Sequence, residues 1–177
     1  AVQQPRDRNP GMISADDVVS LANAFDAAGI RYWIGGGWGV DALLGTQTRD
    51  HDDLDISVPA DQETLVVTTL EALGFTVSTD WRPVRVALRD GGGREVDVHP
   101  IRFRTDGSAW LPSMDGGRFE YPADCFTAGV IAGRDVPCLS ASQQVAFHRG
   151  YELQAKDRAD LQALATAGLI ETPEAAT

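Results

Sequence analysis

The most constraining stretch of this 177-residue chain is residues 33–57, where an apolar run ends in a glycine cluster and an Asp-Leu-Asp triplet follows. Side chains alternate faces along a β-strand, so Asp53 and Asp55 are expected to point the same way while Leu54 points into a core. Two carboxylates directed at one spot resist ionisation unless a cation lies between them. Because oxygen-only ligands suit Mg²⁺, the stretch predicts a metal site beside a glycine turn.

A second acidic strand is expected further along the chain. A glycine-rich turn separates two strand-like runs, the second of which ends at His99, a pattern typical of a β-hairpin. Glu95, Asp97 and His99 share one face of that second strand, as Asp53 and Asp55 share one face of theirs. Acidic residues are disfavoured in strands, so several of them on corresponding faces of two strands indicate a bound cation rather than a face that is only solvated. We therefore predict Asp53, Asp55 and Asp97 as metal ligands.

The remaining pattern predicts an α/β fold in which a small mixed sheet has helices on one face. The reason is that both acidic strands carry one apolar and one polar face. Helices are expected over residues 14–28, 38–44, 59–73, 140–153 and 157–167, with strands or hairpins between them and a loop-rich segment over 105–121. We expect a flexible tail over 1–13, one domain over 14–139, C-terminal helices packed on it over 140–170, and a second tail over 171–177.

Composition excludes some classes of protein. The net charge of −11 argues against nucleic acid as a partner and is compatible with a cationic substrate, although solubility alone would explain it. There is no apolar run long enough to span a membrane and no signal-peptide core, so we expect no membrane association. The two cysteines, Cys125 and Cys138, match no metal spacing, and a reduced, cytoplasmic protein is the simplest interpretation.

The glycine pair, the short helix and the Asp-x-Asp strand together resemble the DNA polymerase β-like nucleotidyltransferase superfamily. The closer resemblance is to small antibiotic nucleotidyltransferases, because residues 36–41 are Gly-Gly-Trp-Gly-Val-Asp and residues 51–55 are His-Asp-Asp-Leu-Asp. Both segments are similar to aminoglycoside 2″-nucleotidyltransferases and to lincosamide nucleotidyltransferases. Residues 129–133 and Cys138 look more like the aminoglycoside enzymes. The segments that look like short lincosamide enzymes are 81–85, 97–101, 106–108 and 147–151.

This resemblance implies a nucleotidyltransferase fold and transfer of AMP from ATP, or of another nucleoside monophosphate, to an antibiotic hydroxyl. It also implies two Mg²⁺ ions, Asp97 as the catalytic base, and antibiotic resistance as the outcome. A lincosamide is the favoured acceptor, and aminoglycoside 2″-O-nucleotidyl transfer is the alternative. An alternative of another class is a non-catalytic nucleotide-binding or interaction protein. The oligomeric state stays open, with a homodimer as one candidate.

Gly36 and Gly37 are the first candidates for nucleotide binding, because glycines at a helix N-terminus let backbone N–H groups approach phosphate. A tight strand-to-helix turn would need the same glycines. A dinucleotide-binding turn is a further alternative, since residues 37–42 fit Gly-x-Gly-x-x-Ala. The other candidates carry positive charge or hydrogen-bonding groups that could equally serve structural or surface roles. They are Arg49, His51 and Lys156.

The acceptor site is expected to combine aromatic walls with a few polar groups. His99 shares the face of Asp97 and could touch substrate or position the base. Tyr151 lies on an expected helix beside His148, and at least one of that pair is expected to pack in the core. The full set of candidate substrate-binding residues is Trp81, Arg85, His99, Trp110 and Tyr151.

Overall fold

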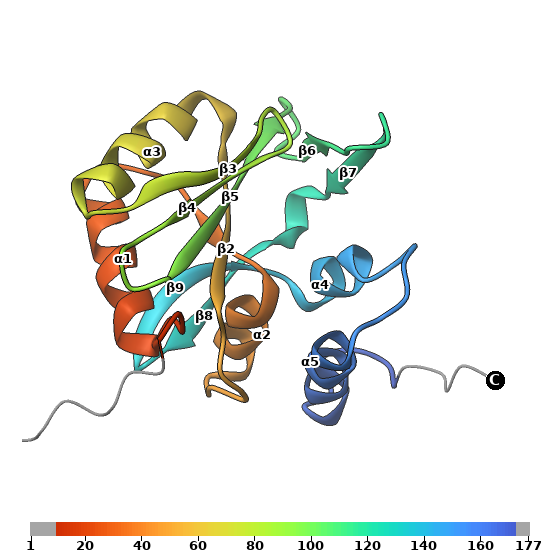
Figure 1. The fold of residues 1–177 in the computed structure, drawn as a ribbon. Helices are drawn as coiled ribbons and strands as arrows, with labels where there is room; N and C mark the ends of the chain where they lie inside the picture. The colour runs from red at the N-terminus through yellow and green to blue at the C-terminus, as the bar shows by residue number, and fades with distance from the viewer. Residues whose placement is uncertain (1–9, 173–177) are drawn as a thin grey trace, which may run out of the picture.

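The structure, a computed structural model, describes residues 10–172, which contain nine strands joined in one sheet (Figure 1). The strand order is β3-β4-β5-β2-β1-β9-β8, and β6 connects β5 to β7. The strands are β1 (Trp33–Ile34), β2 (Asp53–Pro59), β3 (Thr76–Trp81), β4 (Arg85–Arg89), β5 (Glu95–Phe103), β6 (Ala109–Pro112), β7 (Arg118–Tyr121), β8 (Phe126–Ile131) and β9 (Arg134–Leu139). The helices are α1 (Ala15–Ala27), α2 (Gly36–Leu44), α3 (Glu63–Ala72), α4 (Ala141–Phe147) and α5 (Ala155–Thr166), with 3-10 turns η1 (Ala60–Gln62) and η2 (Ala123–Cys125).

The two predicted acidic strands, β2 and β5, are neighbours in the sheet. They run parallel, with Asp55 opposite Asp97 and Ser57 opposite His99. β1 and β9 are also parallel, whereas β1 with β2, β3 with β4, and β4 with β5 are antiparallel. The sheet is therefore mixed, which confirms the predicted fold class. Because side chains alternate along β2 and β5, each strand has polar side chains on one face of the sheet and apolar side chains on the other.

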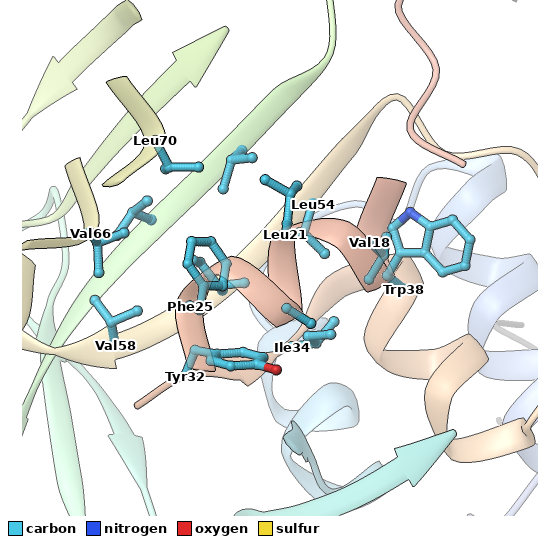
Figure 2. Close-up of a cluster of buried hydrophobic side chains, with 14 of the residues drawn as sticks. Val18, Leu21, Phe25, Tyr32, Ile34, Trp38, Leu54, Val58, Val66 and Leu70 are labelled. Carbon is cyan, nitrogen blue, oxygen red and sulfur yellow. The ribbon is translucent and has the colours of Figure 1, made fainter. Parts of the chain in front are cut away.

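The apolar face of the sheet is covered by α1 and α3 (Figures 1 and 2). Helix α1 begins at the predicted cap, where the Ser14 side chain accepts from the N–H of Asp17 and Asp17 returns the bond. Side chains from α1, α3 and β2 meet in one buried cluster, so α1 and α3 are anchored mainly by apolar burial. The labelled members on these elements are Val18, Leu21, Phe25, Leu54, Val58, Val66 and Leu70.

The segment 105–121, expected to be a loop, is instead a β-hairpin formed by β6 and β7. Ala109 pairs with Tyr121 and Leu111 with Phe119, and the intervening turn closes where Gly116 donates to the carbonyl of Ser113. Ala109, Leu111 and Tyr121 are buried. The prediction was wrong because the strands are four residues each, too short for alternation to stand out between two turn-rich segments.

Both ends of the described chain refine the expected boundaries. Ile13 is buried, and its N–H donates to the carbonyl of His51 at 2.9 Å, so the expected N-terminal tail does not extend to residue 13. Residues 1–9 and 173–177 of the expected tails lie outside the described part. The helix expected over 140–153 ends at Phe147, and both α4 and α5 contact α2. The division at residue 139 remains a prediction.

No helix within residues 10–172 is long and apolar enough to cross a membrane.

Candidate active site

Asp55, Asp97 and His99 converge on the polar side of the β2–β5 pair. One ligand atom from each lies within 4.8 Å of the other two. Nε2 of His99 is 3.2 Å from Oδ1 of Asp55 and 3.9 Å from Oδ2 of Asp97. The strand register explains this convergence, because Asp55 lies opposite Asp97 and His99 lies two residues further along β5. The predicted shared face of Asp97 and His99 is confirmed.

Asp53 begins the same face of β2, opposite Glu95. Burial, followed by the negative charges of Asp55 and Asp52, raises the pKa of Asp53 to about 7. The positive charge of Lys156 acts in the opposite direction. A divalent cation would relieve this accumulation of like charge, and the oxygen donors are those that Mg²⁺ prefers. The carboxylates of Asp53, Asp55 and Asp97 therefore fit the expected metal, although their roles as ligands remain predictions.

Asp97 is held by a bidentate ion pair with Arg85 on the adjacent strand β4. Nε of Arg85 lies 3.0 Å from Oδ1 of Asp97, and Nη2 lies 3.0 Å from Oδ2. The guanidinium carbon also lies 4.9 Å from the centre of the Trp81 ring, which is half exposed. Burial, with Asp55 nearby, raises the pKa of Asp97 against the lowering influence of His99 and Arg85. Trp81 and Arg85, expected to contact substrate, thus form a support for Asp97 in this structure.

The glycine pair opens α2 directly beside the carboxylates. Gly36 has a φ of 57°, a left-handed conformation that favours glycine, and a Cβ at this position would overlap the carboxylate of Asp55. The N–H of Gly35 donates to the carbonyl of Asp55 at 3.0 Å, which ties the turn to β2. A Cβ on Gly37 would instead overlap the imidazole of His51. The close approach on both sides leaves room only for glycine, and it places the N-terminus of α2 next to the predicted metal site.

His51 packs against this turn rather than beside Asp53. Its exposed fraction is 2%, its Nε2 lies 2.5 Å from Oδ2 of Asp41, and its ring lies 4.6 Å from that of Trp38. The other carboxylate oxygen of Asp41 accepts from the N–H and the hydroxyl of Thr48. The structure therefore places His51 in a buried pair with Asp41, a partner ten residues earlier that the strand-alternation argument could not indicate.

The two cationic nucleotide-binding candidates have different surroundings. Arg49 makes a bidentate pair with Asp160 of α5, with Nε and Nη2 each 2.9 Å from a carboxylate oxygen. Lys156 is exposed on the first turn of the same helix, and its charge lowers the pKa of Asp53. Arg49 is thus engaged in joining α5 to the segment before β2, whereas Lys156 stands near the carboxylates with its ammonium group on the surface. Binding of nucleotide by either residue remains a prediction.

A cavity of about 250 Å³ opens from this cluster toward the C-terminal segment. Asp55, His99 and Tyr151 all line this cavity, and binding of the acceptor by Tyr151 remains a prediction. The Tyr151 hydroxyl is 2.6 Å from Nδ1 of His148. The further lining residues are Gly35, Gly36, Ser57, Leu111, Phe119, Tyr121, Leu139, Gln144, Phe147 and His148. Most of these side chains are apolar or aromatic, so the cavity suits a ligand with an apolar surface.

Trp110 is not among the residues that line this cavity. It pairs with Arg102 across β5 and β6, and its ring lies 5.5 Å from the guanidinium carbon of Arg102 and 4.7 Å from that of Arg118. Its neighbour Leu111 points the other way, into the cavity, because strand residues alternate. The prediction that Trp110 forms a wall of the acceptor site is therefore not supported by its position.

The aromatic wall of the cavity was missed by sequence reasoning. Phe119 and Tyr121 of β7 both pack against Phe147 of α4, with ring centres 6.1 and 5.4 Å apart. Alternation along residues 118–121 was the one available signal, since residues 119 and 121 fall on the same face of a strand. This signal groups two residues of one hairpin. It does not indicate that Phe147, 26 residues after Tyr121, completes the wall.

Comparisons with known proteins agree with this geometry. A family model described as aminoglycoside-2″-adenylyltransferase matches residues 17–164. A lincosamide resistance protein of Staphylococcus haemolyticus is 33% identical over 152 residues, covering 86% of this chain and 94% of that protein. A 2″-aminoglycoside nucleotidyltransferase of Klebsiella pneumoniae is 32% identical over 117 residues, covering 66% of this chain and 62% of that protein.

Solved structures show the same fold. The crystal structure of the lincosamide antibiotic adenylyltransferase LnuA with lincomycin bound matches with a TM-score of 0.80 and 32% identity, covering 88% of this chain and 98% of that one. The crystal structure of ANT(2″)-Ia in complex with adenylyl-2″-tobramycin matches with a TM-score of 0.70 and 23% identity, covering 86% and 88%.

Proposed function

Because this chain belongs to the aminoglycoside-2″-adenylyltransferase family of antibiotic nucleotidyltransferases, we propose that it transfers AMP from ATP to a hydroxyl of a lincosamide antibiotic and so confers resistance. The observation that carries the proposal is a cluster of strand carboxylates that borders an aromatic cavity. The two cysteines are free thiols, which suits a reducing cytoplasm.

The nucleotide end of the site is assigned to Gly36, Gly37, Asp53, Asp55 and Lys156. The N-terminus of α2 favours a phosphate, and its glycines let backbone N–H groups approach closely. Asp53 and Asp55 would hold Mg²⁺, with Asp97 completing the set. When bound, Mg²⁺ supplies charge neutralisation for the triphosphate and for the leaving pyrophosphate. Lys156 adds a mobile positive charge at the mouth of the same region.

We propose that Asp97 accepts the proton of the acceptor hydroxyl. The hydroxyl oxygen forms a bond to the α-phosphorus of ATP. The bond between that phosphorus and the oxygen that joins it to the β-phosphorus breaks, and pyrophosphate leaves. A carboxylate offers about four lone-pair positions, so the hydrogen bond from Nε of Arg85 and the ion-pair contact of its Nη2 leave capacity for the hydroxyl proton. Arg85 also fixes the carboxylate orientation, which a general base requires before its pKa matters.

The chemistry of the cavity favours a lincosamide over an aminoglycoside. Asp55 is the one acidic residue among the described residues that line it, whereas the walls include Phe119, Tyr121 and Phe147. An aminoglycoside carries several positive charges, and binding them would call for several carboxylates, because a desolvated charge needs a partner. The aminoglycoside alternative rests on the family model and on relatives such as the Klebsiella pneumoniae enzyme.

Pyrophosphate release tests this proposal against a protein that only binds nucleotide. With ATP and Mg²⁺ we expect release that depends on an added lincosamide and stops when EDTA is present. An aminoglycoside should give a much smaller rate under the same conditions. Tight binding of Mg-ATP by calorimetry without acceptor-dependent release would support the non-catalytic alternative and contradict the proposal.

A further inference from the structure

The carboxylate cluster also contains a nitrogen donor, the imidazole of His99. The ligand atoms that lie within 4.8 Å of one another come from Asp55, Asp97 and His99, so the group combines two carboxylates with one imidazole. Asp53 lies at the start of the same strand face as Asp55, where the charges of Asp55, Asp52 and Asp97 all act on it. Asp55 is therefore common to two possible ion positions, one with Asp53 and one with Asp97 and His99.

From this arrangement we infer that the two metal positions differ in chemistry, and that His99 is a nitrogen ligand of the one nearer the acceptor. The Asp53–Asp55 position offers oxygen only and suits Mg²⁺. The Asp55–Asp97–His99 position offers oxygen and nitrogen, so it should favour first-row transition-metal ions such as Mn²⁺, Co²⁺ or Zn²⁺ over Mg²⁺, because Mg²⁺ takes oxygen ligands whereas affinity for a nitrogen donor rises along the first-row series from Mn²⁺. The inference deepens the proposed function and rests on it for its catalytic meaning.

The distances fit an ion with little rearrangement. Adjacent ligand atoms around an octahedral ion with bonds near 2.1 Å stand about 3 Å apart. Nε2 of His99 already lies 3.2 Å from Asp55 and 3.9 Å from Asp97, and the three ligand atoms all lie within 4.8 Å of one another, so modest side-chain shifts would bring the three donors around one ion. Nε of Arg85 donates to Oδ1 of Asp97 and its Nη2 lies 3.0 Å from Oδ2, which leaves lone pairs on both oxygens.

The position also faces the acceptor. Asp55 and His99 both line the aromatic cavity, whereas Asp53 borders a separate hollow with Asp52 and Glu95. The mixed-ligand ion would thus be the one beside the acceptor hydroxyl, and the oxygen-only ion the one on the nucleotide side. A simpler role for His99 is a hydrogen bond that orients Asp55, and such a role would leave the metal preference of the protein unchanged.

Electron spin echo measurements on the full chain with one equivalent of Mn²⁺, without nucleotide or antibiotic, separate these roles. We expect ¹⁴N modulation from a directly bound imidazole in the wild type and its loss in His99→Ala. His148→Ala is the matched control, because His148 lines the same cavity but its Nδ1 contacts Tyr151. This control should keep the ¹⁴N modulation.

Calorimetry gives a second readout on the same proteins. His99→Ala should weaken Mn²⁺ binding by about 10-fold or more while changing Mg²⁺ affinity by less than about threefold. Absence of ¹⁴N modulation in the wild type, or its persistence in His99→Ala, overturns the inference whether or not the variant is less stable. Because neither readout uses ATP or acceptor, ¹⁴N modulation without antibiotic transfer would refute the proposed function and leave the metal assignment standing.

Discussion

The two halves of the site are built in different ways. The carboxylate half comes from adjacent strands in fixed register, so Asp55, Asp97 and His99 are placed by the backbone pairing of β2 with β5, which continues without a shift from Asp53–Glu95 to Pro59–Ile101. The acceptor half is assembled from β6, β7, α4 and the segment around Tyr151, held mainly by aromatic packing. Under the proposed function, this contrast predicts that the chemistry is fixed by the sheet and that the choice of acceptor is set by elements that can change without disturbing it.

The largest expected effect comes from breaking the carboxylate half. Asp55→Asn should reduce transfer below detection, because Asp55 is shared by both predicted metal positions. The fold should survive, since removing one of several like charges relieves repulsion in the metal-free protein. Turnover and circular dichroism melts on the same preparation check this. Asp61→Asn, on the exposed surface of η1, serves as the control and should be fully active. Near-wild-type turnover in Asp55→Asn would refute the metal assignment.

A somewhat smaller loss is expected when only the base is removed. Asp97→Asn should slow the chemical step by about 10²–10⁴-fold, the usual range for a general base. Its affinity for Mg-ATP should stay within several-fold of the wild type, because Asp53 and Asp55 remain. Single-turnover rates beside titrations of both ligands separate these effects. If Asp97→Asn loses nucleotide affinity but keeps its single-turnover rate, Asp97 is a metal ligand and not the base. If the variant keeps full activity, Glu95 on the same face becomes the next candidate.

A change in the acceptor half should leave the chemistry intact. Phe147→Ala removes an aromatic wall, and we expect the KM for the lincosamide to rise by about 10-fold, equivalent to about 1.4 kcal/mol of lost apolar contact. The KM for ATP should not change. Met114→Ala is the control, since Met114 is an exposed apolar side chain on the β6–β7 turn that does not line the cavity. Equal effects on ATP and lincosamide would mean that the two halves are not separable.

The change with the least consequence for transfer is one in stability, in the absence of metal. The pKa of Asp53 is about 7 in the folded protein against an ordinary value of 3.8, so the folded state holds this proton more tightly than the unfolded state. Stability should therefore fall as the pH rises from about 4 to about 7. Because the pKa of Asp97 is also raised, Asp53→Asn should reduce that fall rather than abolish it, and it should be more stable than the wild type at pH 8 by roughly 1–3 kcal/mol. Denaturant melts in EDTA at both pH values measure it, and an unchanged pH profile in the variant would show that the Asp53 carboxyl is not the cause of the fall.

The same contrast explains how far the sequence could lead. Alternation along β2 and β5 was enough to predict that Asp53, Asp55, Asp97 and His99 share a polar face, because strand geometry is local. It could not predict the partner of His51, since Asp41 is reached by folding of the segment between them. It also could not place Trp110, whose position depends on a hairpin too short to recognise.

Helix α3 shows a further limit. Leu65 and Leu73 fall at helical spacing with Val66 and Leu70, which favours one apolar stripe, but they are 42% and 48% exposed. Residues 60–62 form a 3-10 turn, so the α-helical stripe that meets the sheet starts later and contains Val66 and Leu70. The phase of a helix depends on its first turn, which side-chain spacing alone does not reveal.

The most direct test of the central claim is a competition experiment. The protein is incubated with ATP, Mg²⁺, and equal concentrations of a lincosamide and an aminoglycoside, and the products are identified by mass spectrometry. We predict that the lincosamide gains one adenylyl group while the aminoglycoside remains unmodified, and that Asp55→Asn produces neither product. Adenylylation of the aminoglycoside alone would contradict the assignment of the aromatic cavity to a lincosamide, and the absence of any adenylylated product would contradict the proposed reaction.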